Sequence, residues 1–181
     1  MSEIQVSSRY AKSLIDLAQE QNSLEQIKND VVSFISILKE NPTLLAVLKN
    51  PIISQSKKLN ILDGLFASKF NPMMLSFFKL LVNKGRSPIL HSIAKEFINE
   101  YNVIKNIVKA TVVSAAPLSD ENRKAIVDIV KDTTKGDVLL TEKVDDHLIG
   151  GFVLTIGDKQ FDTSLSSKLR SLKKQFSQKI I

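Results

Sequence analysis

The feature of this sequence that most limits its fold is a change in hydrophobic period near Asn106. Before that point apolar residues recur every three or four positions, which is typical of amphipathic helices. After it, the segment 107–115 alternates apolar and polar side chains and is rich in β-branched residues, as strands are. Two periods in one chain predict two folding units, and we place the boundary between residues 105 and 106.

Proline, asparagine and glycine residues divide the first unit into helices. The residue before a proline disfavours helix, whereas the proline itself suits a first helical turn. Gly85 can end the fifth helix, and Ser23 with Gln26 predicts a capping box at the start of the second. We therefore expect a mainly α fold class in which residues 1–105 form an N-terminal six-helix bundle. The proline-containing boundaries are Asn41-Pro42, Asn50-Pro51, Asn71-Pro72 and Ser87-Pro88.

Residues 106–181 mix strand and helix patterns and predict a small C-terminal α+β domain. Strand patterns cover 107–115, 138–144 and 151–156, and Gly157-Asp158 is typical of a hairpin turn. One helix is expected over 122–131 and another after Asp162. The apolar stripe of this last helix consists of Leu165, Leu169, Leu172 and Phe176.

The positive charge is concentrated at the end of the chain. There are 25 basic and 19 acidic residues, a net charge of +6, and the segment 168–181 contains five basic residues and no acidic one. A nucleic-acid-binding module could use this basic helix. Such surfaces more often spread basic residues over one face with aromatic residues between them, so we favour a solvated helix end.

The motifs of common active sites are missing. The chain has no cysteine and two histidines, which excludes disulfides and multi-histidine metal cages. Gly150, Gly151 and Gly157 fit neither a dinucleotide-binding nor a P-loop spacing. Asp145-Asp146 follows the strand pattern 138–144. Adjacent aspartates on a strand would point to opposite faces and not to one cation, and aspartates in turns more often cap helices than bind a metal. We expect no catalytic residue, no metal and no cofactor; a small phosphotransfer or hydrolytic enzyme using residues 150–162 remains the alternative.

Membrane association is expected to be indirect. No stretch approaches the roughly 18 continuous apolar residues of a membrane span. The first residues resemble neither a secretory signal nor a transit peptide, so we expect the protein to stay in the compartment where it is made.

The fifth helix, 73–84, is apolar almost all round. It lies either at the centre of the bundle or beside a groove for a partner helix, and the residues alone favour the central position. Several positions at helical spacing share a face on the first helix, and others do so on the fifth. The first set is Tyr10, Ser13, Leu14 and Leu17, and the second is Ser76, Leu80 and Asn83.

Over essentially its full length the chain resembles the delta subunit of bacterial F-type ATP synthases, which is homologous to the mitochondrial oligomycin-sensitivity-conferring subunit. The resemblance rests on six blocks that occur in order. They are Arg9-Tyr10-Ala11-Lys12; Asn50-Pro51 with Lys57-Lys58 and Ile61-Leu62; 77–81 with Asn83-Lys84-Gly85-Arg86; Ser114-Ala115-Ala116-Pro117-Leu118-Ser119; Asp145 with Leu148-Ile149-Gly150-Gly151-Phe152; and Gly157-Asp158 with Asp162-Thr163-Ser164 and Lys168-Leu169.

The resemblance implies a non-catalytic stator subunit. Its bundle would bind the N-terminal helix of an alpha subunit of the catalytic head in a groove between the first and fifth helices, formed by the two sets of residues above. Its C-terminal domain would hold the b subunits of the peripheral stalk, so that the head does not turn with the rotor. The implied location is the cytoplasmic face of the bacterial cell membrane, and the implied partners include no nucleic acid.

Overall fold

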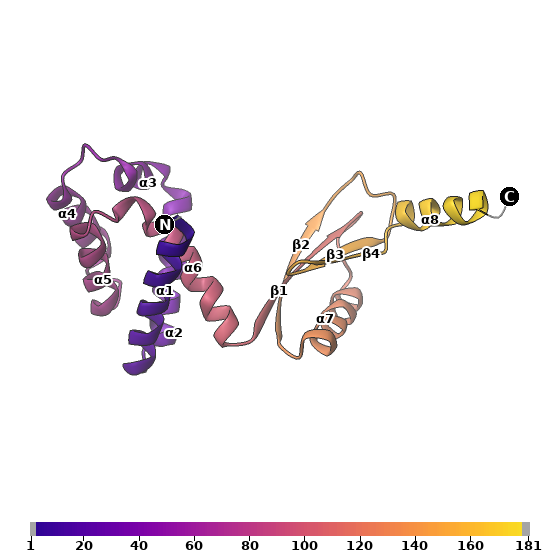
Figure 1. Cartoon of the computed structure of the whole chain (residues 1–181), viewed down its shortest axis with the longest axis horizontal. Coiled ribbons are helices and arrows are strands. Elements are labelled where there is room, and N and C mark those ends of the chain that lie inside the picture. The colour runs from indigo at the N-terminus through magenta and orange to yellow at the C-terminus, as the bar shows by residue number, and fades with distance from the viewer. Residues whose placement is uncertain (1–2, 179–181) are drawn as a thin grey trace. The chain divides into compact units, whose positions relative to one another are not determined.

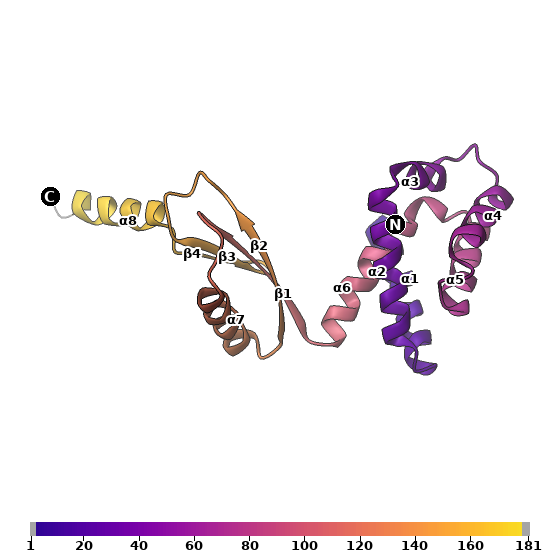
Figure 2. The same cartoon turned by 180° about the vertical axis from the view of Figure 1, so that it is seen from behind.

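The computed structural model describes residues 3–178 and shows a mainly helical chain with one small four-stranded sheet. The chain divides into two compact units, the first ending at Asn102 and the second beginning at Val103. The helices of the first unit and the sheet of the second can be followed in both views (Figure 1 and Figure 2). Each unit has its own set of buried hydrophobic side chains.

The first unit is built from helices joined by short turns (Figure 1). The elements are α1 (Glu3–Glu20), α2 (Leu24–Glu40), α3 (Pro42–Lys49), α4 (Gln55–Phe66), α5 (Pro72–Asn83), the 3-10 turn η1 (Ser87–Ile89) and α6 (Leu90–Ile104). The sequence predicts one long helix from Ser87, but the structure splits it into η1 and α6. The Ser87 hydroxyl donates a hydrogen bond to the Leu48 carbonyl, 3.0 Å away, and this contact holds η1 against the end of α3.

Four phenylalanines form the centre of this unit. Phe34 of α2 lies 4.8 Å from Phe78 of α5 between ring centroids, and Phe66 of α4 stacks on Phe70 at 4.6 Å. Phe34 also meets Phe66 edge to face at 5.6 Å. Aromatic pairs in these arrangements add to the free energy gained by burying their area. The cluster therefore joins α2, α4 and α5 into one core.

The expected capping box at the start of α2 is not formed. The Ser23 side chain makes no capping hydrogen bond, and its hydroxyl instead faces the Ala18 carbonyl at the end of α1, 3.5 Å away. The Gln26 amide oxygen accepts a hydrogen bond from the side chain of Asn71, 3.1 Å away. The Gln26 side chain therefore makes a long-range hydrogen bond to Asn71 and not the local capping bond that the sequence pattern predicts.

The second unit contains β1 (Ile107–Ser114), α7 (Asp120–Thr134), β2 (Asp137–Val144), β3 (Phe152–Ile156), β4 (Lys159–Asp162) and α8 (Leu165–Gln178). The strand order is β2-β1-β3-β4. Strands β1 and β2 are parallel and joined by α7, because a parallel pair needs a long crossover connection. The other two pairs are antiparallel, and β3 and β4 form the hairpin expected at Gly157-Asp158.

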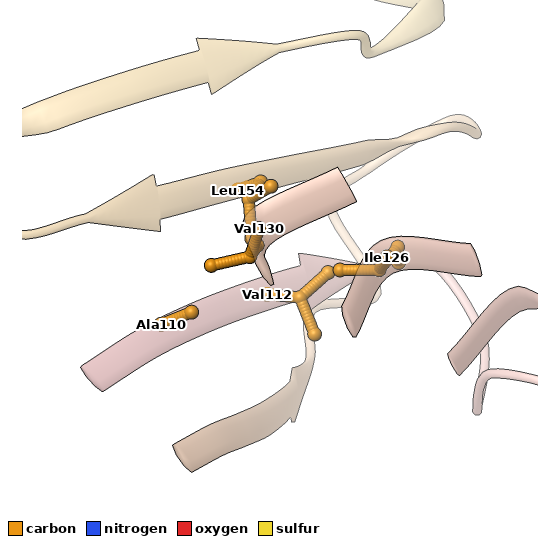
Figure 3. Close-up of a cluster of buried hydrophobic side chains, with 5 residues drawn as sticks. All are labelled: Ala110, Val112, Ile126, Val130 and Leu154. Carbon is orange, nitrogen blue, oxygen red and sulfur yellow. The ribbon is translucent and has the colours of Figure 1, made fainter. Parts of the chain in front are cut away.

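Helix α7 covers one face of the sheet (Figure 3). Ile126 and Val130 of the helix pack against Ala110, Val112 and Leu154 of the strands, and all five side chains are buried. The alternation predicted for β1 is confirmed, since Ala110 and Val112 share the buried face. Strand β2 ends at Val144, as the predicted strand 138–144 does, so Asp145-Asp146 lies in a turn, where the Asp145 carboxylate accepts a hydrogen bond from the backbone of His147.

Candidate partner-binding groove

Helix α1 has one flank fixed to α6. Glu100 of α6 accepts a hydrogen bond from Ser8 at 3.2 Å and pairs with the ammonium of Lys12 at 3.6 Å. The Ser92 hydroxyl donates to Glu3 at 2.7 Å. The buried stripe of α1, formed by Ser7, Ala11, Leu14, Ile15 and Ala18, faces the core. The flank of α1 away from α6 is consequently available to line a surface groove.

Helix α5 begins at a hydrogen-bonded cap. The Asn71 side chain accepts from the backbone N–H of Met73 at 2.9 Å, and the backbone N–H of Asn71 donates to the Asp30 carboxylate of α2 at 2.7 Å. Burial raises the pKa of the Asp30 carboxyl, and the hydrogen bond from Asn71 opposes that shift. These contacts fix the start of α5 relative to α2.

The apolar excess of α5 serves two surfaces. One face enters the core through Met74, Phe78, Leu81 and Val82. The opposite side remains partly open, with the Leu80 side chain 48% exposed. The sequence left open whether this helix is central or borders a groove. In the structure α5 contributes one face to the core and leaves another face partly exposed.

A groove of about 530 Å³ runs between α1 and α5. Its wall on α1 includes Leu17, 40% exposed, and its wall on α5 includes Leu80. A groove with half-exposed leucines on both walls is typical of sites that bind the apolar stripe of a helix. The groove is lined by Leu17, Gln21, Asn71, Pro72, Met73, Ser76, Phe77 and Leu80.

A smaller pocket of about 220 Å³ lies nearer the start of α1. Arg86, just beyond α5, is on its other side, and the lining residues are Val6, Arg9, Tyr10, Ser13 and Arg86. Ser13 lies one helical turn from Leu17, so the smaller pocket and the larger groove follow each other along α1.

The structure distributes the seven sequence-predicted site residues over four places. Leu17, Ser76 and Leu80 line the groove, and Tyr10 and Ser13 line the smaller pocket. Leu14 is only 2% exposed and belongs to the core, and Asn83 is exposed but lines neither hollow.

Sequence reasoning missed several lining residues. On the fifth helix, Met73 and Phe77 share a helical face with Leu80, and Gln21 follows Leu17 by one turn. These spacings were the signal in the sequence that could have identified them. Both serine hydroxyls already donate their hydrogen within their own helix, Ser13 to the Arg9 carbonyl and Ser76 to the Pro72 carbonyl, both at 2.9 Å, so toward a partner each can act as an acceptor.

A second exposed apolar surface lies on α8. The helix is capped where it leaves the sheet: Asp162 accepts from the backbone of Ser164 at 2.9 Å, and the backbone of Leu165 donates to the Gly150 carbonyl at 3.0 Å. Beyond this anchor the stripe predicted from the sequence is exposed, reaching 67% at Phe176. Its members are Leu165, Leu169, Leu172 and Phe176.

The family model described as ATP synthase delta (OSCP) subunit matches residues 6–176. The chain belongs to this family. The delta subunit of Cytophaga hutchinsonii ATP synthase is 36% identical over 181 residues, covering 100% of this chain and 99% of that protein. The delta subunit from Amoebophilus asiaticus is 38% identical over 177 residues, covering 97% and 96%.

A solved structure supports the fold of this delta/OSCP family member. One chain of the cryo-EM structure of the Toxoplasma gondii mitochondrial ATP synthase hexamer aligns with a TM-score of 0.73, at 24% identity, over 94% of this chain and 96% of that one. The family resemblance stated from the sequence motifs is confirmed. Delta/OSCP subunits are structural stator components of ATP synthase and not its catalytic subunits, and this chain is one of them.

One of the residues considered for chemistry, Gly151, has a structural role in this delta/OSCP chain. Among residues 3–178 no group of three or more histidine, aspartate or glutamate side chains could hold a metal ion. Gly151 has a positive φ of 80°, and a side chain there would meet the backbone of Thr163.

Among residues 3–178 no single helix is long and apolar enough to span a membrane. Helices α2 and α3 taken together would pass by length and composition, but the chain bends by 100° between them.

Proposed function

We propose that residues 1–105 form a six-helix bundle that binds the N-terminal helix of an alpha subunit in the groove between α1 and α5. The observation that supports this is the pair of half-exposed leucines, Leu17 and Leu80, on opposite walls of an apolar groove. An amphipathic helix buries its apolar stripe in such a groove and leaves its polar side in water. Binding of this kind would hold the stator to the catalytic head.

Titration calorimetry with a peptide of the cognate alpha-subunit N-terminus tests this assignment. Leu80→Glu places a charge on the groove wall and is expected to abolish measurable binding while the helical circular dichroism remains. Ser13→Glu, at the junction with the smaller pocket, is expected to behave likewise. The matched control is Leu65→Glu, since Leu65 of α4 is 45% exposed and does not line the groove. Wild-type affinity in both folded variants would place the alpha-subunit site elsewhere.

We further propose that residues 106–181 hold the b subunits of the peripheral stalk through α8. The support is an amphipathic helix whose apolar stripe is exposed and whose polar side carries basic residues, Lys168 and Arg170 among them. Such a helix suits an acidic amphipathic partner, because apolar burial and charge attraction act together. In the assembled complex the chain would then sit at the cytoplasmic face of the bacterial cell membrane without entering it.

Truncation after Lys168 tests the b-subunit assignment. This cut removes most of the apolar stripe but keeps Asp162 and the buried Ser164, which anchor the helix start. The truncated protein should lose binding to the soluble part of the b subunits and keep binding to the alpha-subunit peptide. A control, Leu139→Glu, changes a leucine of the sheet that is similarly exposed. Retained b-subunit binding in the truncated protein would refute the assignment.

A further inference from the structure

Helix α8 leaves the sheet and is not packed on it beyond its first turn. Both views show the helix extending away from the strands that it follows (Figure 1 and Figure 2). Every side chain from Lys168 to Phe176 is exposed, the apolar stripe included. A surface helix usually keeps its direction because an apolar face packs on a neighbouring element. Since the described part of α8 buries no such face, its direction depends on the residues at its base.

The base of α8 is hydrogen-bonded to the start of β3. The backbone N–H and the hydroxyl of Thr163 both donate to the Phe152 carbonyl, at 3.0 Å and 2.8 Å. The N–H of Leu165 donates to the Gly150 carbonyl at 3.0 Å. Three hydrogen bonds therefore join the base of the helix to one neighbouring segment, residues 150–152.

Two glycines let this segment approach the base of α8 closely. A Cβ atom at Gly151 would lie 2.6 Å from the Thr163 carbonyl oxygen and 2.9 Å from the Cα of Ser164. A Cβ atom at Gly150 would lie 2.8 Å from the Cδ1 of Leu165. Gly151 also has a φ of 80°, a conformation that glycine adopts without steric cost. The Gly150-Gly151 pair, which fits no phosphate-binding spacing, thus has a packing role at the base of the helix.

Asp162 joins the end of β4 to the first turn of α8. Its carboxylate accepts a hydrogen bond from the N–H of Ser164 at 2.9 Å and another from the Ser167 hydroxyl. Ser164 is only 3% exposed, and its hydroxyl accepts from the N–H of Ser167 at 3.3 Å, as an N-cap does. The hydrogen bonds from Ser167 and Ser164 lower the pKa of the Asp162 carboxyl, so these contacts favour its charged form. Two side chains therefore close the first turn of the helix against the last strand.

We propose that Asp162 and the Gly150-Gly151 pair form a rigid joint that sets the direction of α8, with Asp162 as a positioning residue for the stalk-binding helix. The inference rests on the b-subunit binding proposed above. The 14 residues of α8 are about 21 Å long, so a swing of about 20° at the joint would move its last turn by about 7 Å. A fixed direction favours binding, because less conformational freedom is then lost when the partner packs on the apolar stripe.

Distances between two spin labels test the joint in the full chain. The sequence has no cysteine, so Thr141→Cys on β2 and Lys174→Cys on α8 give one unique pair of labels. Both positions are exposed, and Lys174 lies on the side of α8 opposite to the apolar stripe. Pulsed electron–electron double resonance should give a narrow distance distribution. Asp162→Ala or Gly151→Ala should widen it about twofold or more, because α8 is then free to swing.

Two controls separate the joint from a general effect of substitution. Asp162→Asn keeps a side-chain oxygen for the Ser164 N–H and should stay narrow, as should the matched control Asp128→Ala on the exposed side of α7. A wild-type width in either folded variant would overturn the joint, and so would a wild-type distribution already as wide as theirs. Circular dichroism distinguishes a swinging helix from a melted one. If Asp162→Ala loses the helical signal of the 14 residues of α8, Asp162 is only a helix cap and the joint is refuted.

Calorimetry with the soluble part of the b subunits tests the positioning role. Asp162→Ala should weaken binding about fivefold, whereas Asp162→Asn and Asp128→Ala should stay within about twofold of wild type. A widened distance distribution together with wild-type affinity would overturn the positioning role. The stalk assignment is judged separately by truncation after Lys168. If the truncated chain still binds the b subunits, that assignment fails, while the spin-label distances still decide whether the joint exists.

Discussion

The ammonium group of Lys58 in α4 donates a hydrogen bond to the hydroxyl of Ser87 in η1, 2.9 Å away. Both groups also donate to the Leu48 carbonyl at the end of α3, at 2.9 Å and 3.0 Å. Lys58 and Ser87 are each only 4% exposed, and burial lowers the pKa of the lysine. Three segments that are distant in sequence are thus joined by one buried polar triangle.

Replacing Lys58 by methionine should lower the free energy of unfolding by about 1–3 kcal/mol, because the Leu48 carbonyl and the Ser87 hydroxyl each lose a donor. Ser87→Ala should cost about 1 kcal/mol, and the double variant should cost less than the sum, since the two share an acceptor. Urea denaturation measures all three. The control is Lys57→Met at the exposed neighbouring position, expected within about 0.5 kcal/mol of wild type. Equal stability of the two methionine variants would contradict a structural role for Lys58.

Stability should depend on pH through His91, at the start of α6. Burial lowers the pKa of this imidazole below its ordinary 6.5, and the neighbouring Lys95 and Lys49 lower it further. Between the lowered pKa and 6.5 the unfolded chain binds more protons than the folded one, so the free energy of unfolding falls as the solution is acidified. Urea unfolding at about pH 7 and about pH 5 should show a smaller loss for His91→Gln than for wild type. An unchanged pH dependence would show that His91 does not contribute.

Two glycine-to-alanine substitutions should have opposite effects. At Gly151 a Cβ atom would lie 2.6 Å from the Thr163 carbonyl oxygen, and φ is 80°, so Gly151→Ala should destabilise by about 2 kcal/mol or more. Gly64 lies within α4, and the space that an added methyl group would fill there is open, so Gly64→Ala should stabilise by about 0.5–1 kcal/mol. Thermal unfolding compares them; a Gly151→Ala protein as stable as wild type would show that the close approach is relieved by movement.

The helical unit is expected to fold without the sheet-containing unit. A fragment of residues 1–105 includes all of α1 to α6 and the phenylalanine cluster. Its circular dichroism should be strongly helical, and its affinity for the alpha-subunit peptide should equal that of the full chain. If the fragment is unfolded or contains much strand, the boundary predicted between residues 105 and 106 is wrong.

Much of this structure was predictable from local sequence, because local patterns report the period of burial and the conformations that prolines and glycines permit. The Asn71-Pro72 pair did start α5, and the alternation at Ala110 and Val112 did mark the buried face of β1. The six ordered motifs identified the family, which the comparisons confirm. The groove between the first and fifth helices was expected only through that resemblance.

Tertiary packing decided which side chains of a shared helical face meet solvent. Leu14 and Leu17 are one turn apart on the same face, yet Leu14 is in the core and Leu17 lines the groove, because neighbouring helices cover only one flank of α1. Packing likewise brought Arg9 to the same pocket as Arg86. It also placed the Gln26 side chain where it accepts a hydrogen bond from Asn71 and does not cap its own helix. Such pairings join residues far apart in the chain, and a hydrophobic period carries no information about which distant partner completes them.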